Sequence, residues 1–92
     1  MPAVRVFIVE DEKIVSRDLQ NVLESMGYEV AGVATSGEEA VGLIPGLRPD
    51  IVLMDIMLKG RMDGIEAAER VRSELEVPLI YLTAYADDMT LQ

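Results

Sequence analysis

The chain has 92 residues, half of them apolar, and a net charge of −9 from 17 acidic and 8 basic residues, a length that suits one domain over residues 1–92. It contains no cysteine and no histidine, which excludes thiol nucleophiles, serine–histidine–aspartate triads and zinc sites with thiolate or imidazole ligands. The basic residues are scattered, whereas a duplex-binding surface needs them clustered, so we expect no direct binding to nucleic acid.

The first third of the chain predicts a strand, a helix and a second strand. Apolar residues 4–9 form the first strand and run into the acidic residues 10–12. Apolar residues then repeat at helical spacing until Gly27, which stands where a helix end favours a left-handed residue. Residues 28–34 form a shorter, more polar strand, which indicates an edge position.

The middle of the chain predicts a second helix and a buried strand. Ser36 and Glu39 form the pattern of a capping box at the helix start. We expect this helix to stop at Pro45-Gly46, because proline lacks an N–H and clashes with the preceding turn. Residues 50–54 are continuously apolar after Asp50, which indicates a strand buried on both faces of a parallel sheet.

The last third predicts a loop, a third helix and a fourth strand. Residues 57–64 form the loop, and Asp63 with Glu66 repeats the capping-box pattern. Residues 77–82 form the strand, and residues 87–92 look like the first turn of another helix. Strands that alternate with helices imply parallel crossovers and an α/β fold.

No stretch of the sequence predicts a membrane span or a signal peptide. The longest apolar stretch, residues 51–58, is interrupted by Asp55 and is too short to cross a bilayer. The first five residues lack a basic region followed by a long apolar core. We therefore expect a soluble protein without a membrane partner and a cytoplasmic location, with which the absence of cysteine is compatible.

Three acids follow strands that should lie side by side. Glu10 and Asp11 follow the first strand and Asp55 follows the third, at the carboxyl edge where α/β sheets bind ligands. Taken singly, Asp55 could merely close a strand, and Glu10 or Asp11 could cap the next helix. Unit charges ~4 Å apart repel by about 4 kcal/mol at an effective dielectric of ~20, so the cluster needs raised pKa values or a bound cation. Magnesium suits it, because this ion takes one or two carboxylates with waters and phosphate oxygens.

With magnesium bound, Asp55 can attack phosphorus and form an aspartyl phosphate. Thr83 ends the fourth strand at the same edge, where its hydroxyl can donate to a phosphoryl oxygen, although threonine is also ordinary in strands. Lys59 lies in the loop after Asp55, and we expect it at the solvated surface.

Four short motifs, in chain order, resemble those of a response-regulator receiver domain. They are Glu10-Asp11, Met54-Asp55-Ile56-Met57-Leu58, Asp63-Gly64 and Leu82-Thr83-Ala84. The resemblance covers essentially the whole chain. It implies a flavodoxin-like, doubly wound parallel sheet of order 2-1-3-4, with the fifth strand and helix of the family missing from this chain.

The resemblance also implies a site and a role. Magnesium would be held by Glu10, Asp11, Asp55 and the backbone carbonyl of Met57, and Thr83 would contact the phosphoryl group. The phosphoryl group would come from a sensor histidine kinase or a phosphotransfer protein. The chain would be a phospho-accepting signalling domain of a two-component phosphorelay. It would not be an enzyme, apart from slow self-dephosphorylation. The sequence does not identify its output domain.

The sequence departs from the family pattern in two places. The lysine that ends the family's fifth strand has no counterpart, because Lys13 and Lys59 are the only lysines. The loop over residues 58–64 is one residue longer than the common version. The resemblance also implies that Met57 and Tyr85, which stand two residues after Asp55 and Thr83, tune the access of hydrolytic water to the phosphorylated site.

Two alternative functions and one expectation about association complete the hypotheses. The chain could be a truncated receiver that serves as an assembly module or fragment without switching. A metal-dependent aspartyl phosphatase fits less well, because Met57 stands where such enzymes commonly place a second acid. We expect the isolated chain to be marginally stable or to associate through residues 77–92, at the exposed edge of the fourth strand.

Overall fold

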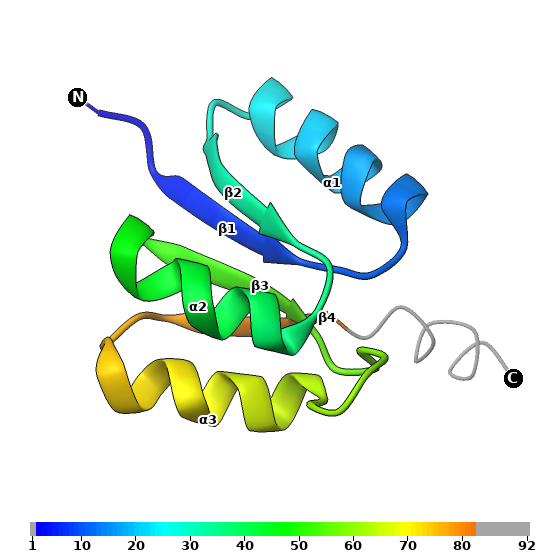
Figure 1. The fold of residues 1–92 in the computed structure, drawn as a ribbon. Coiled ribbons are helices and arrows are strands. Elements are labelled where there is room, and N and C mark those ends of the chain that lie inside the picture. The colour runs from blue at the N-terminus through cyan, green and yellow to red at the C-terminus, as the bar shows by residue number, and fades with distance from the viewer. Residues whose placement is uncertain (1, 83–92) are drawn as a thin grey trace, which may run out of the picture.

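The computed structural model describes residues 2–82, in which strands and helices alternate (Figure 1). The elements are β1 (Arg5–Val9), α1 (Lys13–Ser25), β2 (Glu29–Ala34), α2 (Gly37–Leu47), β3 (Ile51–Asp55), α3 (Gly64–Glu74) and β4 (Leu79–Leu82). All four strands are parallel and lie in the order β2-β1-β3-β4. This order confirms the predicted α/β fold class and the predicted edge position of the second strand.

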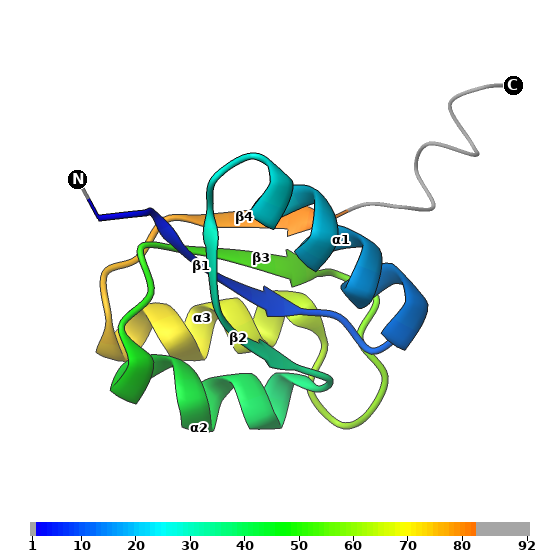
Figure 2. The same cartoon turned by 90° about the horizontal axis from the view of Figure 1, so that it is seen from above.

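The helices cover the two faces of the sheet unequally. Figure 2 shows α2 and α3 on one face and α1 on the other. The main core lies between the sheet and the α2–α3 layer, where Phe7, Ile44 and Met54 are fully buried. On the opposite face α1 packs against β2, and no helix within residues 2–82 covers β3 and β4. The helices of this region are also too short or too polar to cross a membrane.

This arrangement makes the prediction for β3 right on one face and wrong on the other. Val52 and Met54 are fully buried against the core, whereas Ile51 and Leu53 are only partly buried on the α1 face. The sequence predicts a strand that is buried on both faces, but α1, the helix on the second face, packs against β2 and does not cover β3.

Two of the helices begin with side-chain caps, as predicted. The Ser36 hydroxyl accepts a hydrogen bond from the Glu39 N–H at 3.1 Å, and Asp63 accepts one from the Glu66 N–H at 2.8 Å. The Glu39 carboxylate reaches back one residue beyond the cap, to the N–H of Thr35 at 2.9 Å. Each cap supplies a partner to an N–H that the helix itself leaves free.

The predicted end of the second helix is wrong. α2 continues through Pro45 to Leu47 and ends at Arg48, which has a left-handed φ of 49°. Pro45 lacks the N–H that would bond the carbonyl four residues earlier, yet the chain keeps helical geometry for two more residues. The Arg5 guanidinium also holds this turn by donating to the carbonyls of Leu47 and Arg48 at 2.9 and 3.2 Å. Gly27, by contrast, follows α1 with a φ of 94°, as predicted.

The cap of α2 gives a test of these local contributions. Replacing Ser36 by Ala should lower the free energy of unfolding by about 1 kcal/mol, since the Glu39 N–H loses its acceptor. Ser25→Ala is the matched control, because the Ser25 hydroxyl donates only to a carbonyl of its own exposed helix end, and we expect a change within about 0.5 kcal/mol. Urea unfolding measures both; equal losses would contradict the capping role.

Candidate functional site

The register of β1 and β3 brings the three predicted acids together. Val9 pairs with Met54, so Glu10 and Asp55 emerge at neighbouring positions on the carboxyl edge. One carboxylate oxygen each from Glu10, Asp11 and Asp55 lies within 4.8 Å of the others. Two strand ends far apart in the sequence therefore form one acidic cluster.

The cluster is largely shielded from solvent, and none of its acids caps a helix. Glu10 is 5% exposed and Asp55 is 9% exposed. The N-cap of α1 is Glu12, and its side chain makes no capping hydrogen bond. The interpretation of Glu10 or Asp11 as a helix cap is therefore wrong, and the burial of Glu10 requires another explanation.

Each carboxylate accepts one hydrogen bond from a backbone N–H. Met57 donates to Asp55 Oδ1 at 2.9 Å, Glu12 donates to Glu10 Oε2 at 3.1 Å, and Lys59 donates to Asp11 Oδ2 at 3.3 Å. These bonds orient the carboxylates but place no full positive charge beside them. Within residues 2–82, these hydrogen bonds therefore balance the negative charge of the cluster only in part.

The electrostatics of Glu10 reflect this imbalance. Burial raises the pKa of the Glu10 carboxyl from 4.5 to about 7, and the nearby Asp55 carboxylate adds to the increase while the Glu12 N–H opposes it. A proton or a cation can relieve the same repulsion. The oxygen-only donor set and the partial burial fit Mg²⁺, which prefers hard oxygen ligands.

The floor of the site depends on a glycine at the start of α3. The Gly64 N–H donates to the Ile56 carbonyl at 3.2 Å, directly after Asp55. A Cβ on residue 64 would collide with the Asp55 carbonyl oxygen and would lie 2.9 Å from the carbonyl carbon. Only glycine lets the helix start approach the end of β3 this closely.

The remaining predicted site residues are Lys59, Met57, Thr83 and Tyr85. Lys59 is exposed as expected, and its backbone N–H donates to Asp11, a contact for which the sequence carries no local signal. Met57 has a 64% exposed side chain, and its carbonyl as a metal ligand stays a prediction. Thr83 and Tyr85 lie outside the described residues.

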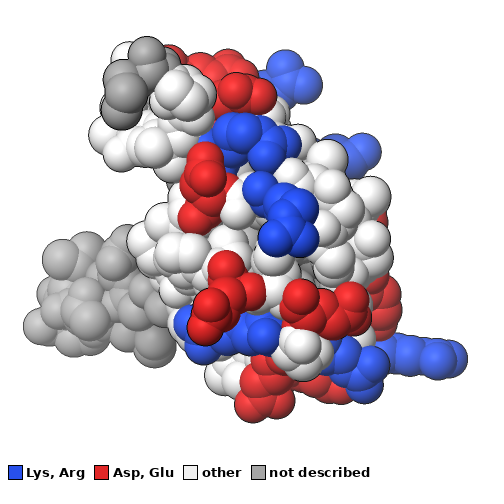
Figure 3. Space-filling view, turned by 90° about the vertical axis from the view of Figure 1, so that its left-hand side faces the viewer, with Lys and Arg blue, Asp and Glu red and all other residues white. Residues whose placement is uncertain are grey.

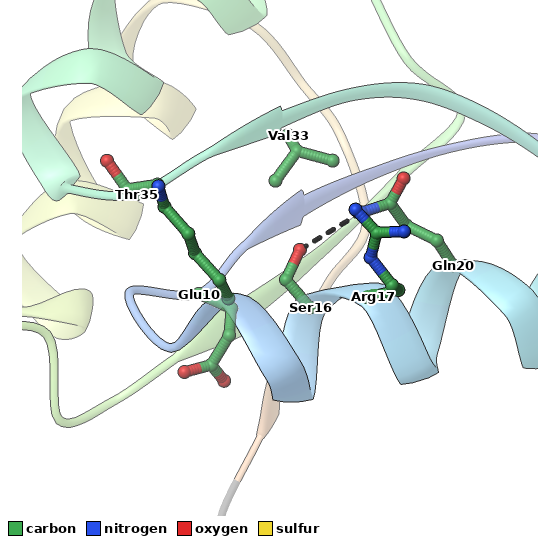
Figure 4. Close-up of a pocket in the computed structure, with 7 residues that line it drawn as sticks. Glu10, Ser16, Arg17, Gln20, Val33 and Thr35 are labelled. Atoms are coloured by element: carbon green, nitrogen blue, oxygen red, sulfur yellow. Dashed lines mark hydrogen bonds between the residues drawn. The ribbon is translucent and has the colours of Figure 1, made fainter.

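A second polar feature adjoins the cluster between α1 and β2. A pocket of about 200 Å³ is lined by residues that include Glu10, Arg17 and Thr35. Figure 4 shows the Ser16 hydroxyl accepting a hydrogen bond from Gln20, at 3.2 Å, with the Glu10 carboxylate turned away from this pair. The Glu10 backbone therefore borders this pocket while its carboxylate belongs to the acidic cluster.

A family model and a similar protein of known name both point to response regulators. Residues 6–92 match the family described as the response regulator receiver domain. The transcriptional regulatory protein PdtaR of Mycobacterium tuberculosis is 43% identical over 82 residues, which cover 89% of this chain and 40% of PdtaR. This chain therefore spans less than half the length of that relative.

Solved structures show the same likeness in three dimensions. The signal receiver domain of a modulated diguanylate cyclase from Desulfovibrio desulfuricans G20 has a TM-score of 0.86 and 48% identity, over 96% of this chain and 70% of that one. The response regulator PhyR from Brucella abortus has a TM-score of 0.84 and 34% identity, over 95% and 36% of the two chains.

The raised pKa of Glu10 predicts how stability depends on pH in metal-free protein. The folded state binds the Glu10 proton more tightly than the unfolded state. This contribution is therefore complete below about pH 4.5 and is lost as pH rises through about 7. Relative to Glu10→Gln, the wild type should lose at most about 3 kcal/mol of unfolding free energy across this range. Urea unfolding in EDTA measures it; parallel pH profiles for the two proteins would contradict the prediction.

The close contact at Gly64 predicts a strong effect of one added methyl group. Gly64→Ala should lower the free energy of unfolding by about 1–3 kcal/mol, because backbone atoms of Asp55 cannot move aside without disturbing the sheet. Gly42→Ala is the matched control, since a Cβ on this α2 glycine meets nothing within 4 Å and should stabilise by up to about 1 kcal/mol. Similar unfolding midpoints for the two variants would show that the contact is unimportant.

Proposed function

The chain belongs to the response regulator receiver domain family, and we propose that its Asp55 accepts a phosphoryl group from a partner phosphohistidine in a magnesium-dependent reaction. The donor is a sensor histidine kinase or a phosphotransfer protein. Receiver domains are signalling domains, and in this proposal the phosphorylated aspartate is a signal rather than an intermediate of metabolism.

One observation carries the proposal: an orientated aspartate stands beside two other carboxylates at the carboxyl edge of the sheet. The Met57 N–H fixes the rotation of the Asp55 carboxylate, and Glu10 and Asp11 supply oxygens within 4.8 Å. A carboxylate held in this way has lost rotational freedom before it reacts, which favours nucleophilic attack.

The proposed phosphoryl transfer forms one bond to phosphorus and breaks one. A carboxylate oxygen of Asp55 forms a new O–P bond as the N–P bond of the phosphohistidine breaks, and the electron pair of that bond remains on the imidazole nitrogen. Asp55 thereby becomes an acyl phosphate, while Glu10 and Asp11 keep their places. The Thr83 hydroxyl is proposed to donate to a phosphoryl oxygen of the product.

A bound Mg²⁺ would supply the positive charge that the three carboxylates and the incoming phosphoryl group lack. Glu10, Asp11 and Asp55 would hold the ion, with the Met57 carbonyl as a further proposed ligand, and the bound ion offsets the negative charge of carboxylates and phosphoryl oxygens. The shielded position of the cluster strengthens this effect, since electrostatic interactions weaken in bulk water.

The output is proposed to follow from a change of surface around the phosphorylated site. PhyR from Bartonella quintana has been solved in complex with the anti-sigma factor NepR, and PdtaR is named a transcriptional regulatory protein. For this chain we propose a cytoplasmic protein partner or a further domain that recognises the phosphorylated form. The likeness to these relatives supports a partner of this kind without specifying it.

Incubation with acetyl phosphate and Mg²⁺, followed by intact-mass measurement, tests the proposal. The wild type should gain the mass of one phosphoryl group, and Asp55→Asn should gain none. Asp18→Asn is the matched control, because Asp18 is an exposed aspartate on α1, and it should be labelled like the wild type. A folded wild type that stays unlabelled, or equal labelling of Asp55→Asn, would refute the proposal.

A further inference from the structure

The polar pocket between α1 and β2 brings two cationic side chains together. It has a volume of about 200 Å³ and is lined by Lys13 and Arg17 of α1, with Val33 of β2 and Thr35 just after that strand. Lys13 and Arg17 are four residues apart, so they lie on one side of the helix. Two of the eight basic residues of an acidic chain therefore border a single pocket.

These two cations are not paired with acids in the part of the chain that the structure describes. Neither of the two ion pairs within residues 2–82 involves Lys13 or Arg17. Like charges at this spacing on a helix repel each other. An anion held between the two side chains would replace this repulsion by two attractions.

Basic residues elsewhere on the molecule lie among acids. Figure 3 shows the side at the amino ends of the strands, where Lys and Arg side chains are interspersed with Asp and Glu side chains. Arg5, at the start of β1, has its Nε 3.9 Å from a Glu29 carboxylate oxygen and also donates to the carbonyls of Leu47 and Arg48. The donors of Arg5 are thus used within the protein, whereas those of Lys13 and Arg17 face a pocket.

The carboxylates close to the pocket lining are engaged elsewhere. Glu10 lines the pocket, but Figure 4 shows its carboxylate turned away, and this group belongs to the acidic cluster. Glu39 contacts the lining through Thr35, whose N–H and hydroxyl donate to Glu39 Oε1 at 2.9 and 3.3 Å. Within residues 2–82, the positive charge at the pocket is therefore available to a ligand.

A buried hydroxyl adds a further donor to the pocket. Ser16 is 5% exposed, and its hydroxyl accepts a hydrogen bond from the Gln20 amide at 3.2 Å. Among residues 2–82 this hydroxyl donates to no acceptor. Figure 4 shows the Ser16 hydroxyl and the Arg17 guanidinium on the side of α1 that faces Val33. A buried donor without an acceptor costs free energy, and an anionic oxygen in the pocket would accept its proton.

The charge and geometry of these donors fit a phosphate group. A phosphate ester carries a charge of about −1.5 to −2 at pH 7, which matches two cations, whereas a carboxylate carries only one charge. The guanidinium of arginine matches phosphate oxygens with paired N–H groups, and lysine adds a compact charge. A water molecule occupies about 30 Å³ in the liquid, so the pocket admits one small anion with a few waters.

We propose that the pocket between α1 and β2 binds a phosphate-class anion, with Arg17 and Lys13 balancing its charge and the Ser16 hydroxyl donating to one of its oxygens. The site is distinct from the acidic cluster, because the Glu10 carboxylate belongs to the cluster and only the rest of this residue borders the pocket. The proposal is independent of phosphorylation at Asp55. Inorganic phosphate and the phosphate of a small phosphorylated molecule offer the same chemistry.

Titration of the isotope-labelled chain with inorganic phosphate, followed by amide NMR shifts, tests the site. EDTA in the buffer removes divalent cations, so the acidic cluster repels the probe. The shifts of residues 13–20 and 33–35 should saturate. Arg17→Gln should weaken binding by at least about tenfold, because charge-assisted hydrogen bonds to the anion are lost. Arg17 is exposed, so this variant should fold, and Lys13→Gln should weaken binding in the same direction.

Arg72→Gln is the matched control. It removes the same charge from an exposed position of α3, on the opposite face of the sheet, and should bind phosphate like the wild type. Shifts that do not saturate overturn the proposal. Binding that survives Arg17→Gln, or that Arg72→Gln weakens equally, overturns it as well.

Two further probes identify the kind of ligand. Acetate should bind more weakly than phosphate, because one negative charge leaves a cation unpaired, and equal binding of the two would overturn the assignment to phosphate. Methyl phosphate separates the two sources of the anion. Tighter binding than inorganic phosphate supports a small phosphorylated molecule as the occupant, and weaker binding supports free phosphate.

Discussion

The repulsion among three carboxylates held at the ends of two neighbouring strands is the constraint on which the rest of this structure depends. Parallel pairing of Val9 with Met54 sets Glu10 and Asp55 side by side, and both are almost fully buried. A chain without a function at this edge gains nothing from such an arrangement, because the backbone N–H groups around it only partly balance the charge. A cation bound among these carboxylates would relieve the same repulsion.

The surrounding fold keeps these groups close together. The glycine at residue 64 lets α3 begin against the Asp55 carbonyl, and the Asp63 cap fixes that helix start. The long loop between β3 and α3 returns to the cluster through the Lys59 N–H. The acidic cluster is thus held together by ordinary structural contacts, each of which involves a backbone group.

Much of this arrangement could be predicted from the sequence, because strands, helices and the carboxyl edge follow from local periodicity and parallel connection. What could not be predicted depends on tertiary contacts. Arg5, forty residues away, holds the turn that contains Pro45 and lets α2 continue. The partial exposure of Leu53 likewise reflects which helices cover the sheet, and no local pattern of residues 50–54 contains that information.

The most direct test of the central claim is the effect of Mg²⁺ on stability above about pH 7, where the Glu10 carboxyl is mostly ionised. A ligand that binds only the folded state raises the free energy of unfolding in proportion to the logarithm of its concentration. Urea unfolding of the wild type with increasing Mg²⁺ should show this increase, and Asp11→Asn should reduce it strongly. Equal Mg²⁺ dependence of the two proteins, or none in the wild type, would contradict a cation site formed by these acids.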